Sequence, residues 1–124
     1  MELGMGYNGV TVLVVEDEIL VRMDIVQSLE EGGFNVLEAS NADDAIILLD
    51  AHPEVRLMFT DIDMPGSMDG LKLAAAVRNR WPPVQIIVTS GHRAMSDDNL
   101  PVVGRFFSKP YDPSRVIHAI HEMI

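Results

Sequence analysis

Residues 57–66 of the chain read LMFTDIDMPG: an apolar run ends abruptly in an aspartate, and turn-forming residues follow at once. The run at residues 55–60 is short, bulky and bounded by turn formers, which predicts a buried strand. Asp61 then falls at the carboxyl end of that strand, where open α/β sheets place their ligand crevices. A carboxylate there can act as a nucleophile, a metal ligand or both, or it can simply cap a turn.

Strand and helix patterns alternate on both sides of this central strand. Apolar runs predict four further strands, at residues 10–15, 34–39, 84–89 and 102–108. Caps and apolar spacing predict helices at residues 19–31, from a cap at Ser40 or Asn41 to just before Pro53, from Asp69 to Arg80, and from Asp112 to about residue 123. We therefore expect an α/β fold: a flavodoxin-like, doubly wound parallel sheet of five strands in the order 2-1-3-4-5, with helices on both faces.

The segment between the fourth and fifth strands differs from the other connections. Residues 93–101 are mostly polar, and their only apolar side chains besides proline are Ala94, Met95 and Leu100. These are too few for a stable amphipathic helix, and Pro101 limits its length. We predict that the helix expected between the fourth and fifth strands, the fourth helix of the fold, is short, irregular or absent. We also predict that this segment is the most mobile part of the domain. We also expect it to form the partner surface together with the last helix.

Length and composition limit the class of protein. The chain has 124 residues, of which 48% are hydrophobic, enough for one globular domain at residues 10–124 after a flexible lead-in at residues 1–9. No apolar run reaches the ~20 residues of a membrane span, and no secretory signal is visible. A formal charge of −10 argues against direct nucleic-acid binding. The absence of cysteine excludes disulfides and thiolate metal sites and fits a cytoplasmic location.

Polar residues converge on one edge of the predicted sheet. Glu16 and Asp17 follow the first strand and Asp61 ends the third, and the switch point of the expected topology falls between those strands. Neighbouring carboxylates repel one another, so they require a cation or shifted pKa values, and their hard oxygen ligands favour Mg²⁺, Ca²⁺ or Mn²⁺. Ser90 and Lys109 follow the fourth and fifth strands, where a hydroxyl and an ammonium would complement phosphoryl oxygens. The set suits phosphoryl transfer onto Asp61.

Five short motifs along the chain point to a family. In order they are 14-VVEDE-18, 61-DIDMP-65, 69-DG-70, 89-TSG-91 and 106-FFSKP-110. From residue 10 onward the chain resembles the receiver domain of two-component response regulators, of the kind found in chemotaxis regulators. Each motif is weak by itself, but all five in the order of the family are a strong signal.

The resemblance implies a phosphoacceptor and a metal site. Asp61 would accept a phosphoryl group from a sensor histidine kinase or a histidine phosphotransfer protein. Asp17, Asp61 and the backbone carbonyl of Asp63 would bind Mg²⁺, and Glu16 would act through a metal-bound water. Glu16 stands where the family often has aspartate, which is a common exchange.

The resemblance also implies a switch. Ser90 would be the switch hydroxyl, Phe106 the switch aromatic and Lys109 the phosphate-binding lysine, with a cis bond between Lys109 and the following proline. Thr89 also carries a hydroxyl, and we choose Ser90 because a glycine follows it, as the family pattern expects. Phe106 lacks the hydroxyl of the tyrosine often found there, and we expect it to prefer burial.

The function implied is a phosphorylation-activated signalling switch, dependent on Mg²⁺, in a two-component phosphorelay. Such a domain assists its own phosphorylation and dephosphorylation and is otherwise not an enzyme. The output would be a downstream protein target or a fused output domain, and the resemblance also allows a homodimer. We expect no contact with nucleic acid or membrane. The chain is either a stand-alone regulator or a receiver taken from a hybrid kinase or larger regulator.

Two other functions start from the same residues. One is a pseudo-receiver, a protein-interaction module that is never phosphorylated; the intact acidic pair, phosphoacceptor, hydroxyl and lysine argue against it. The other is a phosphatase, because Asp61-x-Asp63 resembles the start of the haloacid-dehalogenase motif. That motif lies on the first strand of its family and continues to threonine or valine, whereas Pro65 stands in that place here.

The histidines and the side chain of Asp63 have open roles. His118 and His121 could share a metal, but no third ligand is placed, so we expect them on a solvated face. His92, two residues after Ser90, could tune water access to an acyl phosphate or be a plain loop residue. The side chain of Asp63 could bias hydrolysis or simply face solvent.

Overall fold

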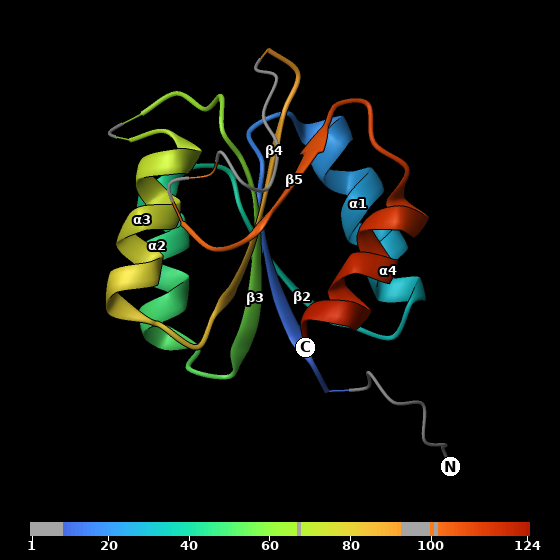
Figure 1. Ribbon diagram of the computed structural model, residues 1–124, viewed down its shortest axis with the longest axis horizontal. Helices are drawn as coiled ribbons and strands as arrows, with labels where there is room; N and C mark the ends of the chain where they lie inside the picture. Colours follow the sequence, from blue (N-terminus) through green and yellow to red (C-terminus); the bar gives the residue numbers. More distant parts are fainter. Residues whose placement is uncertain (1–8, 67, 93–99, 101) are drawn as a thin grey trace.

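The computed structural model describes residues 9–66, 68–92, 100 and 102–124. In chain order the described elements are β1 (Thr11–Val15), α1 (Ile19–Glu31), β2 (Asn35–Ala39), α2 (Ala42–Ala51), β3 (Val55–Asp61), α3 (Gly70–Arg80), β4 (Gln85–Ser90), β5 (Arg105–Ser108) and α4 (Pro113–Met123). Apart from one residue each, the predicted lead-in at 1–9 and the predicted short or absent helix at 93–101 lie outside the described residues. The label α4 therefore denotes the last helix of the chain (Figure 1).

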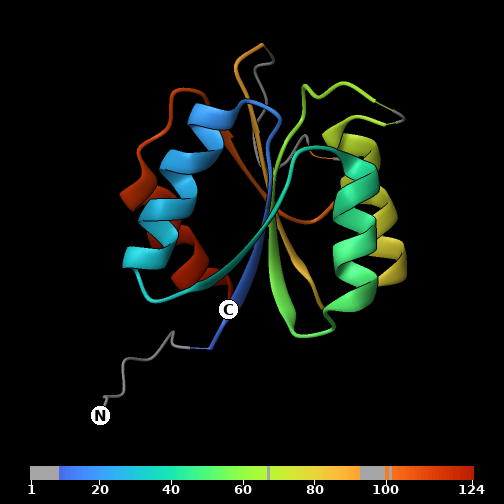
Figure 2. The ribbon, with the colours of Figure 1, turned by 180° about the vertical axis from the view of Figure 1, so that it is seen from behind.

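The strands form one parallel sheet in the order β2-β1-β3-β4-β5, as predicted. Helices α1 and α4 cover one face of the sheet, and α2 and α3 cover the other (Figures 1 and 2). Asp61 lies opposite Thr89 in the ladder, and Ser90 lies opposite Ser108. The register therefore brings the carboxyl ends of β3, β4 and β5 to one edge.

The core has two layers because the sheet is buried on both faces. Every residue of β1 is buried, as expected for a parallel strand that is apolar throughout. Side chains alternate between the faces of a strand. Leu13 and Val15 pack in the cluster with α2 and α3, whereas Val12 and Val14 pack in the cluster with α1 and α4. This alternation decides which helices surround each residue at the end of a strand.

Local capping defines the helix starts. Side chains of Asn41, Asp69 and Asp112 accept hydrogen bonds from backbone N–H groups in the first turns of α2, α3 and α4. Asp69 and Asp112 were predicted as caps, and Asn41 was one of two candidates. Among the described residues, no helix is both long enough and apolar enough to cross a membrane.

Four strands begin later than predicted: β1, β2 and β4 by one residue each, and β5 by three. Strand β4 starts at Gln85, because the N–H of Val84 donates to Trp81 O in the preceding turn, at 3.0 Å. Strand β5 starts at Arg105 rather than at residue 102. The carbonyl of Val103 accepts from the Arg78 guanidinium at 3.0 Å, so this part of the approach to β5 is held by α3.

Candidate functional site

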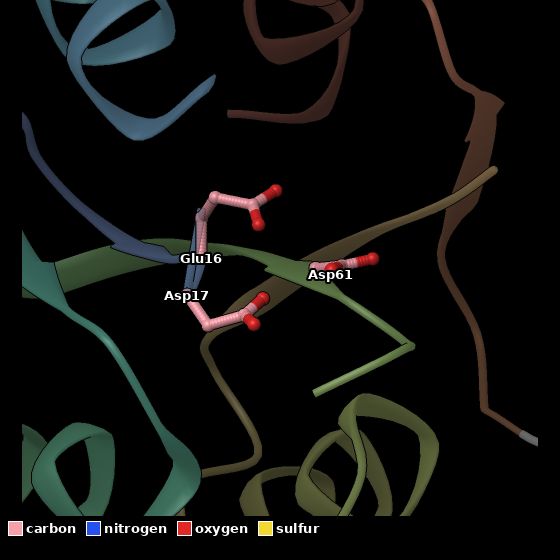
Figure 3. Close-up of side chains that lie close together, drawn as sticks. All are labelled: Glu16, Asp17 and Asp61. Carbon is pink, nitrogen blue, oxygen red and sulfur yellow. The ribbon is translucent and has the colours of Figure 1, made fainter. Parts of the chain in front are cut away.

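Three carboxylates meet at the carboxyl edge of the sheet. Glu16 and Asp17 directly follow β1, and Asp61 is the last residue of β3 (Figure 3). One oxygen from each of the three lies within 4.8 Å of the others. Glu16 and Asp61 are only 1% and 3% exposed. The structure thus brings together the three carboxylates named from the sequence.

Lys109 is the cation of this cluster. Its Nζ lies 2.9 Å from Glu16 Oε1, 3.3 Å from Asp61 Oδ2 and 3.4 Å from Glu18 Oε1. The backbone helps to place it there, because the N–H of Lys109 donates to Ser90 O at 2.9 Å. The bond from Lys109 to the following proline is cis, as predicted. One ammonium cannot neutralise three carboxylates, so the cluster keeps a negative charge.

Burial and charge shift the ionisation of these groups in opposing directions. Burial raises the pKa of Asp61 and of Glu16, and the nearby Lys109 ammonium only partly offsets this. Burial would lower the pKa of Lys109, but the hydrogen bond with Glu16 and the negative charges of Asp61 and Glu16 together raise it above its usual value. Lys109 therefore stays charged at neutral pH.

The oxygen atoms of the cluster fit a hard divalent cation. Asp17 Oδ1 is buried and has no hydrogen-bond partner among the described residues. A buried carboxylate oxygen without a partner is costly unless a ligand satisfies it. Carboxylate oxygens in a cluster with net negative charge are the donors that Mg²⁺ prefers. Asp17 and Asp61 are thus suited to hold such an ion, with Glu16 already bound to Lys109.

The side chain of Asp63 bonds to Ser90. Ser90 Oγ donates to Asp63 Oδ2 at 2.5 Å and accepts from the N–H of His92 at 3.0 Å. The N–H of Asp63 donates to Asp61 Oδ1 at 3.3 Å. Asp63 therefore links the carboxylate at the end of β3 with the hydroxyl at the end of β4. Sequence reasoning left this side chain undecided, because no local pattern reveals a partner 27 residues away.

Ser90, and not Thr89, presents its hydroxyl to this edge. Val88 packs in the cluster with α2 and α3, and Ile87 in the cluster with α1 and α4. By alternation Ser90 shares the face of Val88, and Phe106 packs against the same cluster. Thr89 falls on the other face, where its Oγ1 is buried with no hydrogen-bond partner among the described residues.

Seven residues at this edge of the sheet line a pocket, here called the acidic crevice. Its volume is about 340 Å³, and it is lined by Asp17, Glu18, Asp61, Asp63, Gly91, His92 and Lys109. His92 thus lies on its wall. A larger, more apolar pocket of about 430 Å³ adjoins it at Lys109 and is otherwise lined by Leu20, Val21, Asp24, Pro110 and Tyr111.

The two histidines of α4 belong to no potential metal-binding cluster among the described residues. His118 is 75% exposed in its side chain and pairs with Glu122 at 3.5 Å. The ring of His121 lies 6.0 Å from that of Phe34. The group of side chains that could hold a metal ion consists of Glu16, Asp17 and Asp61, among residues 9–66, 68–92, 100 and 102–124. The expectation of a solvated face for His118 agrees with its exposure.

Comparison with known proteins identifies the family of this chain. The model of the response regulator receiver domain matches residues 12–121. The sensor kinase CckA of Brucella abortus is 34% identical over 92% of this chain, which spans 12% of that protein. The response regulator receiver protein CpdR of the same organism is 30% identical over 91% of this chain and 95% of its own length.

Solved structures agree with this result. The crystal structure of a response regulator receiver protein from Sinorhizobium medicae superposes with a TM-score of 0.84 at 28% identity, covering 93% of this chain and 94% of the other. The chain therefore matches one relative nearly end to end and another over only a small fraction of its length.

Proposed function

Because this chain belongs to the family of response regulator receiver domains, we propose that it is a phosphorylation-dependent signalling switch with Asp61 as its phosphoacceptor. One observation carries the proposal: a nearly buried carboxylate opens into the acidic crevice with Lys109 on one oxygen and a backbone N–H on the other. That carboxylate is oriented on both sides, and positioning is what phosphoryl transfer mainly requires.

The phosphoryl donor is proposed to be a phosphohistidine of a sensor histidine kinase or phosphotransfer protein. An oxygen of the Asp61 carboxylate attacks phosphorus, and a P–O bond forms as the P–N bond breaks. The bonding pair leaves with the imidazole nitrogen, which then takes up a proton from solvent. The product is an acyl phosphate on Asp61.

Lys109 stabilises the charge on the transferred group. Its ammonium already lies 3.3 Å from Asp61 Oδ2 and stays protonated because of its carboxylate neighbours. A phosphoryl group on Asp61 would compete with Glu16 for this ammonium. Lys109 therefore holds the reacting atoms in place both before and after transfer.

The proposed metal is Mg²⁺, held by Asp17, Asp61 and the backbone carbonyl of Asp63, with Glu16 acting through water. The buried oxygen of Asp17, which has no hydrogen-bond partner among the residues that the structure describes, supports this choice. When bound, the ion supplies positive charge that neutralises the carboxylates and the phosphoryl oxygens.

The proposed readout is a protein target or an output domain, reached through the Ser90 hydroxyl and the Phe106 ring. Ser90 turns toward the phosphoryl group and Phe106 fills the space that it leaves. Relatives of both kinds are matched, a receiver protein of nearly the same length and a much longer sensor kinase. A stand-alone regulator and a part of a larger protein are both compatible with this role, and we place either in the cytoplasm.

Intact-mass spectrometry after incubation with Mg²⁺ and acetyl phosphate tests the proposal. Wild type should gain one phosphoryl group, and Asp61→Asn should gain none because an amide is a poor nucleophile. Asp50→Asn, an equivalent change at a half-exposed position of α2, should label like wild type. An unlabelled wild type would favour the pseudo-receiver, and a fully labelled Asp61→Asn would remove Asp61 from the role.

A further inference from the structure

The hydroxyl of Ser90 is already engaged in the resting protein. Ser90 is only 1% exposed. Its hydroxyl donates to Asp63 Oδ2 at 2.5 Å and accepts from the N–H of His92 at 3.0 Å. The short distance and the carboxylate acceptor indicate a charge-assisted hydrogen bond, a stronger class than a bond between neutral groups. The side chain of Asp63 thus holds Ser90 in one arrangement.

A hydroxyl has one proton to donate. While that proton is directed at Asp63, it cannot also be directed at a phosphoryl oxygen on Asp61. The two acceptors are close in the chain and joined by the bond from Asp63 N–H to Asp61 Oδ1, so they compete at the same edge of the sheet. Recruitment of Ser90 by the phosphoryl group therefore breaks a bond that the resting state has made.

We propose that the Asp63 carboxylate is a positioning residue that holds the Ser90 hydroxyl in the resting arrangement, so that a phosphoryl group on Asp61 must displace it to recruit Ser90. This inference rests on the proposed function. The backbone carbonyl of Asp63 has a separate role in that proposal, so the side chain can be changed without removing it. Asp63 would set how far phosphorylation of Asp61 shifts the Ser90 hydroxyl away from its resting arrangement.

The negative charge of Asp63 would by itself also lower the affinity of the crevice for a phosphoryl group. This charge effect must be separated from the effect of the hydrogen bond. Removing a negative charge from the acidic crevice favours any anionic phosphoryl group, whatever Ser90 does. Asparagine removes the charge but keeps an oxygen that can accept from Ser90. Alanine removes the charge and the acceptor together. The part of the difference between these two variants that depends on the Ser90 hydroxyl therefore reports the hydrogen bond.

Binding of beryllofluoride, a phosphoryl mimic, at saturating Mg²⁺ measures the effect. Both Asp63→Asn and Asp63→Ala should bind it more tightly than wild type, and Asp63→Ala should bind about fivefold more tightly than Asp63→Asn, the range of one net hydrogen bond. In a Ser90→Ala background this fivefold difference should vanish. Glu18→Gln, which removes a charge at the rim beside Lys109, should have the same effect with and without the hydroxyl of Ser90.

Equal affinities of Asp63→Asn and Asp63→Ala would overturn the inference, as would a difference that persists without the Ser90 hydroxyl. Labelling of Asp61 by acetyl phosphate is measured on the same samples. A wild type that labels normally while the two variants bind equally overturns the inference and leaves the proposed function intact. A wild type that neither labels nor binds beryllofluoride overturns both.

The resting state offers a second measurement that needs no phosphoryl group. The amide resonance of His92 should shift in Asp63→Ala, because the Ser90 oxygen that accepts from it loses its anchor, and should move less in Asp63→Asn. Unchanged His92 resonances in Asp63→Ala would contradict the resting bond itself.

Discussion

Lys109 is the cation inside a cluster of buried carboxylates. It neutralises part of a buried carboxylate cluster and leaves the remainder negative. Buried charges are costly unless they are paired, so a site of this kind stores an unfavourable interaction that a cation can relieve. The most direct sign of this cost is Asp17 Oδ1, which is buried and finds no hydrogen-bond partner within the described residues.

The first residue-scale prediction concerns the metal. Asp17→Asn should weaken Mg²⁺ binding on the order of tenfold, because one ligand loses its charge in a partly dehydrated site. Isothermal titration calorimetry measures the change, with Asp50→Asn as the control of equal charge. Unchanged affinity in Asp17→Asn would count against Asp17 as a ligand.

The second concerns the stability of the metal-free protein. Burial raises the pKa of Asp61 in the folded state, so the unfolded chain loses this proton first as the pH rises. Stability is therefore lost between the ordinary aspartate pKa and the raised one, and the loss stays complete at higher pH. Asp61→Asn does not lose stability in this way, because an amide does not ionise.

At neutral pH without Mg²⁺, Asp61→Asn should be more stable than wild type. Below the ordinary aspartate pKa the two proteins should be equally stable. Urea denaturation across this pH range measures the gap. A gap that is as large in acid as at neutral pH would mean that ionisation of Asp61 is not its cause.

Helix α3 is held against the site by its first residue. A Cβ atom added at Gly70 would lie 2.0 Å from the backbone oxygen of Asp61, and the N–H of Gly70 donates to Ile62 O at 2.9 Å. The glycine of the motif 69-DG-70 is therefore required by close approach of two backbones. The cap at Asp69 begins the helix, and Gly70 lets it start beside the phosphoacceptor.

Gly70→Ala should lower the free energy of unfolding by about 3 kcal/mol, because the added methyl group meets backbone that cannot move freely. Gly91→Ala is the matched control, since its Cβ would meet only the Lys109 side chain, at 3.7 Å. Chemical denaturation compares the two. Equal stability of the two variants would show that the end of β3 moves easily.

At the scale of the molecule, the site and the last helix are joined through β5. Ser90 and Phe106 share one face of the sheet, and Phe106 follows Arg105, whose guanidinium bonds Glu122 of α4 at 2.8 Å. The proposed movement of Ser90 and Phe106 would therefore reach α4 through β5 and the bond from Arg105 to Glu122. Both faces of the sheet take part, since Phe106 and α4 lie on opposite sides.

Beryllofluoride with Mg²⁺ should therefore change hydrogen-exchange protection in α4 and at residues 93–101, the surface expected from the sequence to meet partners. Helix α2, which packs on β1 and β2 at the far edge of the sheet from β5, is the internal control and should change least. Mass spectrometry of the exchanged peptides measures this. Protection changes confined to α2 and β2 would contradict the predicted output surface.

The sequence alone determined the alternation of elements, the strand order and the edge at which the polar residues gather. Parallel strands buried on both faces appear as apolar runs, and helix caps such as Asp69 and Asp112 are local signals, so neighbouring residues carry this information. The sequence did not predict boundaries that depend on distant contacts. The fifth strand was predicted to start at residue 102, but it starts at Arg105, and the carbonyl of Val103 before it accepts a hydrogen bond from α3.

Only the tertiary structure decided how the site residues are paired. The bond from Ser90 to Asp63 joins residues that are 27 positions apart, and Lys109 meets Glu18 across 91 positions. It also decided that Ser90 and not Thr89 bonds to Asp63 on the wall of the crevice, and that one oxygen of Asp17 is buried with no hydrogen-bond partner in the described part of the chain. Such pairings depend on register, side-chain direction and burial, which are settled only when the strands lie side by side.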